Sequence, residues 1–229
     1  MSKVILITGA SSGIGKAIGD LLCTKDFKVY GTSRNPSKYL DSNFQLFDLN
    51  VNNSDSINSC IDKIIEIEGV LDVLINNAGV GITGPLEEIP EKEIKNNFST
   101  NFFGPLNIIK KVLPLMRSEK RGLIINITSL AAYVGTPYRS VYSASKAALD
   151  LVSETLNMET KPFNIKVVTL APGEFSTNIA SRRYHASSEK NSPYHLNYSK
   201  ALTLMNNHVS GGADPKLIAK LILKIINSK

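Results

Sequence analysis

A tyrosine and a lysine stand four residues apart in the stretch YSASK, from Tyr142 to Lys146. The surrounding sequence SVYSASKAALDLVSETL has helical periodicity, and residues four apart lie on the same face of a helix. A phenol titrates near pH ~10, but an adjacent positive charge stabilises the phenolate. Tyr142 could therefore act as a general acid toward a carbonyl oxygen, with Lys146 lowering its pKa. The alternative is a half-buried tyrosine beside a solvated lysine.

Two further polar residues could take part in the same reaction. Ser129 follows the apolar run GLIINI, and the active-site groups of open α/β sheets gather at the carboxyl ends of strands. Its hydroxyl could hydrogen-bond to a substrate carbonyl, or it could cap a helix or turn. Asn101, in STNFFG, could instead bond to the local backbone.

Short apolar runs alternate with segments of helical periodicity along the chain. The apolar runs predict buried strands at 3–8, 28–33, 44–49, 71–76, 122–127 and 165–171. The helical segments span 13–25, 54–67, 91–117, 141–161 and 214–227. This order predicts an α/β fold with a doubly wound, Rossmann-type parallel sheet of at least six strands, flanked by helices on both faces. A chain of 229 residues fits one domain, 1–229.

The first predicted strand leads into the glycine-rich turn TGASSGIG, which opens the first helix. Gly9, Gly13 and Gly15 allow a tight turn and close approach of the backbone to a ligand, and free N–H groups at a helix start attract a pyrophosphate. Glycines at this place can also serve only to pack a helix against a strand. Because the turn lies between a strand and a helix, nucleotide binding is the favoured interpretation. The remaining predicted contacts of this turn are Ser11, Ser12 and Ile14.

The end of the second strand bears on which nucleotide binds. An acidic residue there would accept hydrogen bonds from the adenosine ribose of NAD, but this chain has GTSRNPSK, with Ser33 at the place of the acid and Arg34 after it. A guanidinium is suited to bidentate recognition of a 2′-phosphate. The sequence therefore favours NADP(H) over NAD(H), unless Arg34 is only a solvated loop residue.

Composition excludes several other classes of function. The formal net charge is +6, but the basic residues are dispersed and form no stripe for nucleic acid. Cys23 and Cys60 have neither disulfide nor metal-ligand spacing, so we expect packing cysteines and no metal site. No apolar run approaches membrane-spanning length, and the N-terminus reads as a strand rather than a signal peptide. We expect a soluble, cytoplasmic protein.

Taken together, these motifs resemble those of the short-chain dehydrogenase/reductase family over nearly the whole chain. The matching segments are TGASSGIG, NNAG (76–79), NFFGP (101–105), NITS (126–129), YSASK and APG (171–173). The stretches NNAGVGITGPLEEI and NFFGPLNIIKKVLPLMR are most similar to the branch of 17β-hydroxysteroid, retinol and acyl-dihydroxyacetone-phosphate reductases.

The resemblance implies roles for residues whose chemistry alone is ambiguous. It places Asp48 and Leu49 beside the adenine, and Asn101 in a proton relay through water. It places Asn76, Ala78 and Gly79 along the adenosine ribose. It also implies that Lys146 holds the nicotinamide ribose. Pro172 and Gly173 belong to the loop that contacts the nicotinamide, and Thr177 would hold its carboxamide.

The sequence departs from the family pattern in two places. After the helix at 214–227 the chain reaches NSK, where family members usually continue into a seventh strand, so the edge of the sheet is open to question. Glu174 directly follows Pro172 and Gly173, where an acid could lie in solvent or select polar substrates. The segment 174–212 shows only weak helical patches near 176–183 and 197–206, and it could be a lid over the substrate or an exposed insertion.

The sequence thus predicts an NADP(H)-dependent oxidoreductase that reduces a ketone or aldehyde to an alcohol, or runs the reverse reaction. Its partner would be a small-molecule carbonyl or alcohol substrate, held by 81–90, 130–138 and 174–212. The rival interpretation is a non-catalytic NADP sensor on the same fold. Apolar residues on more than one face of 91–117 and 141–161 predict a homodimer or homotetramer. They are Phe98, Phe102, Phe103, Leu149 and Val152.

Overall fold

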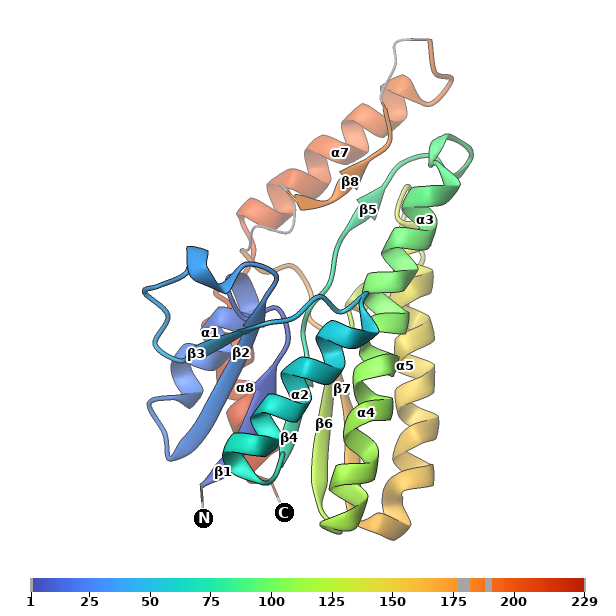
Figure 1. The fold of residues 1–229 in the computed structure, drawn as a ribbon. Coiled ribbons are helices and arrows are strands. Elements are labelled where there is room, and N and C mark those ends of the chain that lie inside the picture. The colour runs from blue at the N-terminus through green and yellow to red at the C-terminus, as the bar shows by residue number, and fades with distance from the viewer. Residues whose placement is uncertain (1, 177–181, 188–190, 229) are drawn as a thin grey trace.

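The computed structural model describes residues 2–176, 182–187 and 191–228, and it shows a six-stranded parallel sheet between two layers of helices (Figure 1). The strands are β1 (Lys3–Ile7), β2 (Phe27–Ser33), β3 (Gln45–Asp48), β4 (Val73–Asn76), β6 (Gly122–Ile127) and β7 (Ile165–Leu170). Their order in the sheet is β3-β2-β1-β4-β6-β7, and every pair is parallel. The predicted fold class is confirmed.

The helices lie close to the predicted segments. They are α1 (Gly13–Leu22), α2 (Ser54–Glu68), α3 (Glu91–Phe98), α4 (Gly104–Ser118), α5 (Ser140–Thr160), α7 (His195–Ser210) and α8 (Lys216–Asn227). Local capping residues set the ends of α2. At its start, the Asn53 side chain accepts a hydrogen bond from the Ser56 N–H at 2.9 Å. The same helix ends at Gly69, which adopts a left-handed φ of 74°.

The chain reverses its direction across the sheet at β1. It passes from β1 outward to β2 and β3, and then returns to place β4 on the other side of β1. At such a reversal the loops after the two neighbouring strands turn toward opposite faces, which leaves a crevice at their carboxyl ends. This crevice is where the glycine-rich turn and the NNAG segment meet.

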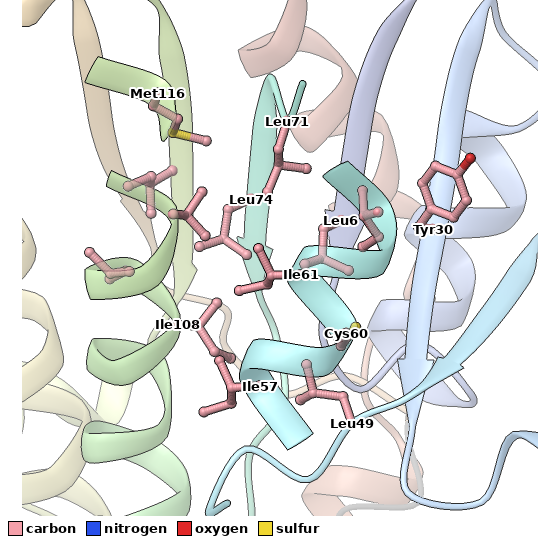
Figure 2. Close-up of a cluster of buried hydrophobic side chains, with 14 of the residues drawn as sticks. Leu6, Tyr30, Leu49, Ile57, Cys60, Ile61, Leu71, Leu74, Ile108 and Met116 are labelled. Atoms are coloured by element: carbon pink, nitrogen blue, oxygen red, sulfur yellow. The ribbon is translucent and has the colours of Figure 1, made fainter. Parts of the chain in front are cut away.

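Two hydrophobic clusters hold the helices against the sheet. On one face, Ile57 and Ile61 of α2 and Ile108 of α4 pack on Leu6 and Leu74 of the strands (Figure 2). On the other face, α1 and α8 cover a second cluster. Each fully buried aliphatic side chain contributes roughly 1.5–3 kcal/mol relative to its exposed state, so these clusters fix the sheet that positions the site.

The predicted helix at 91–117 is not continuous. A π-helical turn over Ser99–Phe103 separates α3 from α4. Within this turn the Asn101 side chain makes hydrogen bonds to the backbone of Val80, which lies far away in the sequence. A long-range bond of this kind leaves no periodic signal, so the helical prediction missed the interruption.

The described residues from Arg182 to the end of α7 form the segment above the crevice, and this segment contributes one strand to a small second sheet. Strands β5 (Ile82–Thr83) and β8 (Tyr184–His185) pair in parallel, and α7 lies beside them, above the carboxyl ends of the main strands (Figure 1). The predicted helical patch at 197–206 lies within α7, whereas the patch at 176–183 falls largely outside the described residues. In the described ranges, no helix is both long and apolar enough to cross a membrane.

Candidate active site

A cavity of about 680 Å³ opens at the carboxyl ends of the strands, beneath α7. It gathers most of the residues that the sequence predicted to bind a cofactor or to catalyse. The predicted residues that line it are Gly9, Ser11, Ser12, Gly13, Ile14, Ser33, Arg34, Leu49, Ala78, Gly79, Ser129, Tyr142, Lys146, Pro172 and Gly173. One site therefore unites motifs spread over about 160 residues of sequence.

Four predicted residues lie near this cavity without lining it. They are Gly15, Asp48, Asn76 and Asn101. Gly15 packs under the turn, because a Cβ there would lie 2.4 Å from the side-chain nitrogen Nδ2 of Asn77. Asp48 is exposed at the end of β3, and its neighbour Leu49 faces the cavity instead. Thr177 lies outside the described residues.

Asn76, which the sequence predicted along the ribose, does not line the cavity. Its side chain is buried and donates a hydrogen bond to the Asn126 side chain at 2.8 Å. Asn126 in turn donates to the Ser153 hydroxyl at 2.7 Å. This buried network ties β4, β6 and α5 together, while the next residue, Asn77, lines the cavity.

The glycine-rich turn has the geometry of an anion cradle. Gly9 and Gly13 adopt φ of 65° and 56°, which residues with a side chain rarely do. A Cβ on Gly9 would approach the Cα of Ala78 to 2.9 Å, so the turn must pack closely against the NNAG segment. The N-cap residue of α1, Ser12, makes no capping hydrogen bond with its side chain, and the first turn holds no acidic residue. The helix start is therefore available to an anionic ligand.

Tyr142 is buried, and its ring forms part of the cavity wall. The pKa of Tyr142 lies above its ordinary value, because burial raises it more than the Ser129 side chain and the nearby Arg139 charge lower it. The Arg139 guanidinium lies 5.0 Å from the centroid of the Tyr142 ring. Arg139 is therefore a cation beside the phenol that the sequence analysis did not name.

Lys146 is a buried cation on the same face of α5. Its Nζ donates a hydrogen bond to the Ile127 carbonyl at 2.8 Å. Burial lowers the pKa of Lys146 to about 8. A Cβ built on Gly79 would lie 3.4 Å from this Nζ, so the amine sits directly against the NNAG segment. Tyr142 and Lys146 thus lie on one helix, and both line the cavity.

Ser129 combines the two roles that the sequence left open. Its hydroxyl accepts a hydrogen bond from the Ala131 N–H at 3.2 Å, which caps a short 3₁₀ turn. The same side chain lowers the pKa of Tyr142 and lines the cavity. The turn thereby fixes the serine beside the phenol.

Asn101 lies beneath the site in the π-helical turn, fully buried. Its Oδ1 accepts from the Val80 N–H and its Nδ2 donates to the Val80 carbonyl, both at 2.9 Å. A third contact joins Nδ2 to the Ser145 hydroxyl at 3.2 Å. Asn101 thus bonds to backbone, but to the distant Val80 rather than to the local backbone that the sequence suggested.

The sequence analysis did not single out several residues that line the cavity. Arg139, Arg183 and Met205 all line the cavity, and Glu174 forms an ion pair with Arg139 at 3.3 Å. Arg139 comes three residues before Tyr142, so helical spacing could have indicated it. Arg183 and Met205 belong to the segment above the crevice, where only tertiary contacts bring them to the site. Glu174, which the sequence left either in solvent or toward a polar substrate, pairs with a site residue.

A scan of known families finds that residues 3–188 match the model described as short chain dehydrogenase. The chain belongs to this family. Among its relatives, 3-ketodihydrosphingosine reductase of Bacteroides thetaiotaomicron is 41% identical over 228 residues, covering 99% of this chain and 84% of that protein. Human retinol dehydrogenase 8 is 32% identical, covering 99% and 78%. The likeness to a reductase branch that includes retinol enzymes is confirmed.

Solved structures agree with this assignment. A short-chain dehydrogenase from Streptomyces avermitilis superposes with a TM-score of 0.87 and 32% identity, covering 100% of this chain and 85% of that one. A short-chain dehydrogenase is an oxidoreductase with a nicotinamide-binding fold, and the cavity fits such a cofactor. The open helix start suits its phosphates, and the exposed Arg34 lies at the rim beyond β2.

Proposed function

We propose that this short-chain dehydrogenase reduces a ketone or aldehyde with NADPH, with Tyr142 as the general acid. The observation that carries the proposal is the buried Tyr142, which lines one cavity together with Ser129 and Lys146. A bound nicotinamide would supply a hydride to the carbonyl carbon.

The residues of the chain would manage the proton and the orientation of the substrate. Ser129 and Tyr142 would hydrogen-bond to the carbonyl oxygen, and Tyr142 would give it a proton as the alcohol forms. Lys146 would hold the nicotinamide ribose, and its ammonium would then favour proton release from the phenol. Asn101 would keep the Val80 segment in place and complete a relay of protons through water.

Binding of the cofactor would use the two ends of the crevice. The glycine-rich turn would hold the pyrophosphate, with the adenine beside Leu49 and the ribose along Ala78 and Gly79. Arg34 would pair with the 2′-phosphate and favour NADP(H) over NAD(H).

The substrate would carry an apolar chain, and it would bind under the segment 174–212 as a lid. Leu130, Tyr133 and Val134 line the cavity and are more than half exposed, so they offer apolar surface to a ligand. Both relatives named above have names that refer to long apolar molecules, which supports this choice. We propose that the reaction takes place in the cytoplasm.

The experiment is the substitution Tyr142→Phe, which keeps the ring but removes the acid. NADPH oxidation would be followed with a panel of long-chain ketones and aldehydes that includes 3-ketodihydrosphingosine and retinal. General acids contribute on the order of 10²- to 10⁴-fold, so turnover should fall by that factor while NADPH affinity changes little. Undiminished reduction by the variant would refute the role of Tyr142. A wild-type protein that binds NADPH but reduces no member of the panel would favour the sensor interpretation.

A further inference from the structure

Arg183 is a buried cation on the wall of the active-site cavity. Its side chain lines the cavity with Tyr142, although the residue is only 9% exposed. One guanidinium nitrogen, Nη2, donates to the Asn206 side chain, and Nη1 makes only a long contact of 4.0 Å with the Met205 sulfur. Nε is buried and has no hydrogen-bond partner in the described part of the chain. The guanidinium therefore has donor capacity left for a ligand.

The charge around Arg183 is not balanced. No carboxylate of the described residues lies within ion-pair distance of it. The nearest charges are Arg139 and Glu174, which already pair with each other at 3.3 Å. Among the described residues, two guanidiniums thus share one carboxylate, which leaves a local excess of one positive charge. Burying an unpaired charge is costly unless a partner of opposite sign arrives.

This excess charge lies next to the reacting centre. Arg139 is 5.0 Å from the ring of Tyr142, and its charge is felt at both Tyr142 and Arg183. Arg139, Tyr142 and Arg183 line the same cavity, so an anion bound here would share that cavity with a carbonyl that Tyr142 protonates. A guanidinium is suited to carboxylate and phosphate alike.

We propose that Arg183, assisted by Arg139, binds an anionic group that the substrate carries near its carbonyl, a carboxylate or a phosphate. The inference rests on the proposed reduction of a carbonyl in the same cavity. It narrows the substrate class to an apolar chain with an anion close to the reacting carbon.

A structural role for Arg183 makes a different prediction. Its bond to Asn206 could serve only to fasten α7 above the crevice. In that case its loss would lower the activity toward all substrates equally, whether charged or neutral. The comparison of an acid with its own ester therefore separates the two roles.

The test compares 2-oxododecanoate and 4-oxododecanoate with their methyl esters as substrates for NADPH oxidation. Charged hydrogen bonds make a difference of tenfold to a hundredfold, so kcat/KM for one of the acids should exceed that of its ester by roughly this factor. Arg183→Met should bring the ratio toward one, because the acid loses much more of its kcat/KM than the ester does. Arg117→Met removes the same charge from the exposed end of α4 and should leave the ratio as in the wild type.

A binding measurement keeps this inference separate from the proposed reaction. Calorimetry on the NADP⁺-saturated protein would compare the two keto acids, their esters and dodecyl phosphate, with Arg183→Lys as a milder variant. Tighter binding of an acid or of the phosphate, lost in Arg183→Met and partly kept in Arg183→Lys, supports the anion site even if no carbonyl is reduced. The anion that binds more tightly, carboxylate or phosphate, identifies the group that Arg183 recognises. Equal binding of acid and ester by the wild type, with no gain for the phosphate, overturns the proposal.

Discussion

Lys146 makes the stability of the unliganded protein depend on pH in a predictable direction. Burial lowers its pKa from an ordinary 10.5 to about 8. Between these values the unfolded chain binds a proton that the folded chain does not, so the free energy of unfolding rises with pH. The rise amounts to about 3 kcal/mol at most, at 1.36 kcal/mol for each pH unit. Below about pH 8 both states are protonated and the full cost of burying the charge remains.

The variant Lys146→Met should lose this dependence, because methionine carries no titrating group. Urea unfolding of both proteins without cofactor, at about pH 7.5, 9 and 10, would measure it. Tyrosines and cysteines titrate in the same range in both proteins, so the difference between the two curves isolates the lysine. Parallel curves would show that folding does not lower the pKa of the Lys146 amine.

The residues after β2 carry the prediction on cofactor choice. Replacing Ser33 with Asp and Arg34 with Ala should reverse the preference from NADPH to NADH. One charged hydrogen bond is worth about 1.5–3 kcal/mol, so the unmodified protein should prefer NADPH by roughly tenfold to a hundredfold. Fluorescence titrations with both cofactors would test this, and equal affinities in the unmodified protein would contradict it.

At the scale of single residues, the sequence predicted which residues form the site better than it predicted how they interact. Tyr142, Ser129 and Lys146 were found because helix spacing and strand ends bring such residues together. The pairing of Arg139 with Glu174 joins the start of α5 to the loop after β7, and no local pattern reveals it. Likewise, no local pattern reveals that the Asn76 side chain bonds to Asn126 of β6, which in turn bonds to Ser153 of α5.

Among the elements, the π-helical turn between α3 and α4 depends most on a single side chain. Asn101→Ala would leave the Val80 N–H without its partner in a partly buried place, while the Val80 carbonyl would keep its hydrogen bond from the Asn97 side chain. An unsatisfied polar group costs about 1–3 kcal/mol, so the free energy of unfolding should fall by about that amount.

Denaturant unfolding would measure this loss, with Asn96→Ala as the control. Asn96 lies one turn earlier on α3, is exposed, and makes only a 3.4 Å contact with Glu93. Its loss should change stability by less than about 0.5 kcal/mol. Equal effects of the two substitutions would mean that the turn does not need the amide.

Regular elements were predictable because their signals are local. The buried strands and amphipathic helices follow periods of 2 and 3.6 residues, which any short stretch displays. Strands β5 and β8 have only two residues each, too few for such a period. Their pairing depends on the return of the chain above the crevice.

For the whole molecule, the outer faces of α4 and α5 support the predicted homodimer or homotetramer. Leu151 and Met158 of α5 are 65% and 63% exposed, and Phe103 at the start of α4 is 53% exposed. Leu149, which the sequence assigned to this surface, is instead buried in the core. Exposed apolar residues seven apart on one helix suit a symmetric contact with a second copy.

We expect light scattering to report at least a dimer at micromolar concentration. The double substitution Leu151→Glu and Met158→Glu should yield the 25.0 kDa monomer, because it places charges in the apolar contact. Leu217→Glu makes the same change at an exposed position of α8 and should leave the assembly intact. A wild-type protein that is monomeric under these conditions would contradict the prediction.

The segment above the crevice is built apart from the rest of the fold. The two clusters that fill the faces of the sheet contain no described residue of α7 or β8. The segment attaches through a third, smaller cluster, which includes Ile82 and Ala186, and through the Tyr198 hydroxyl, which donates to the Thr83 carbonyl at 3.0 Å. Substitutions facing the cavity from α7 therefore spare the packing on which folding depends. In evolution, and in a laboratory library, this arrangement lets selectivity drift toward new carbonyl compounds while the hydride-transfer machinery is inherited unchanged.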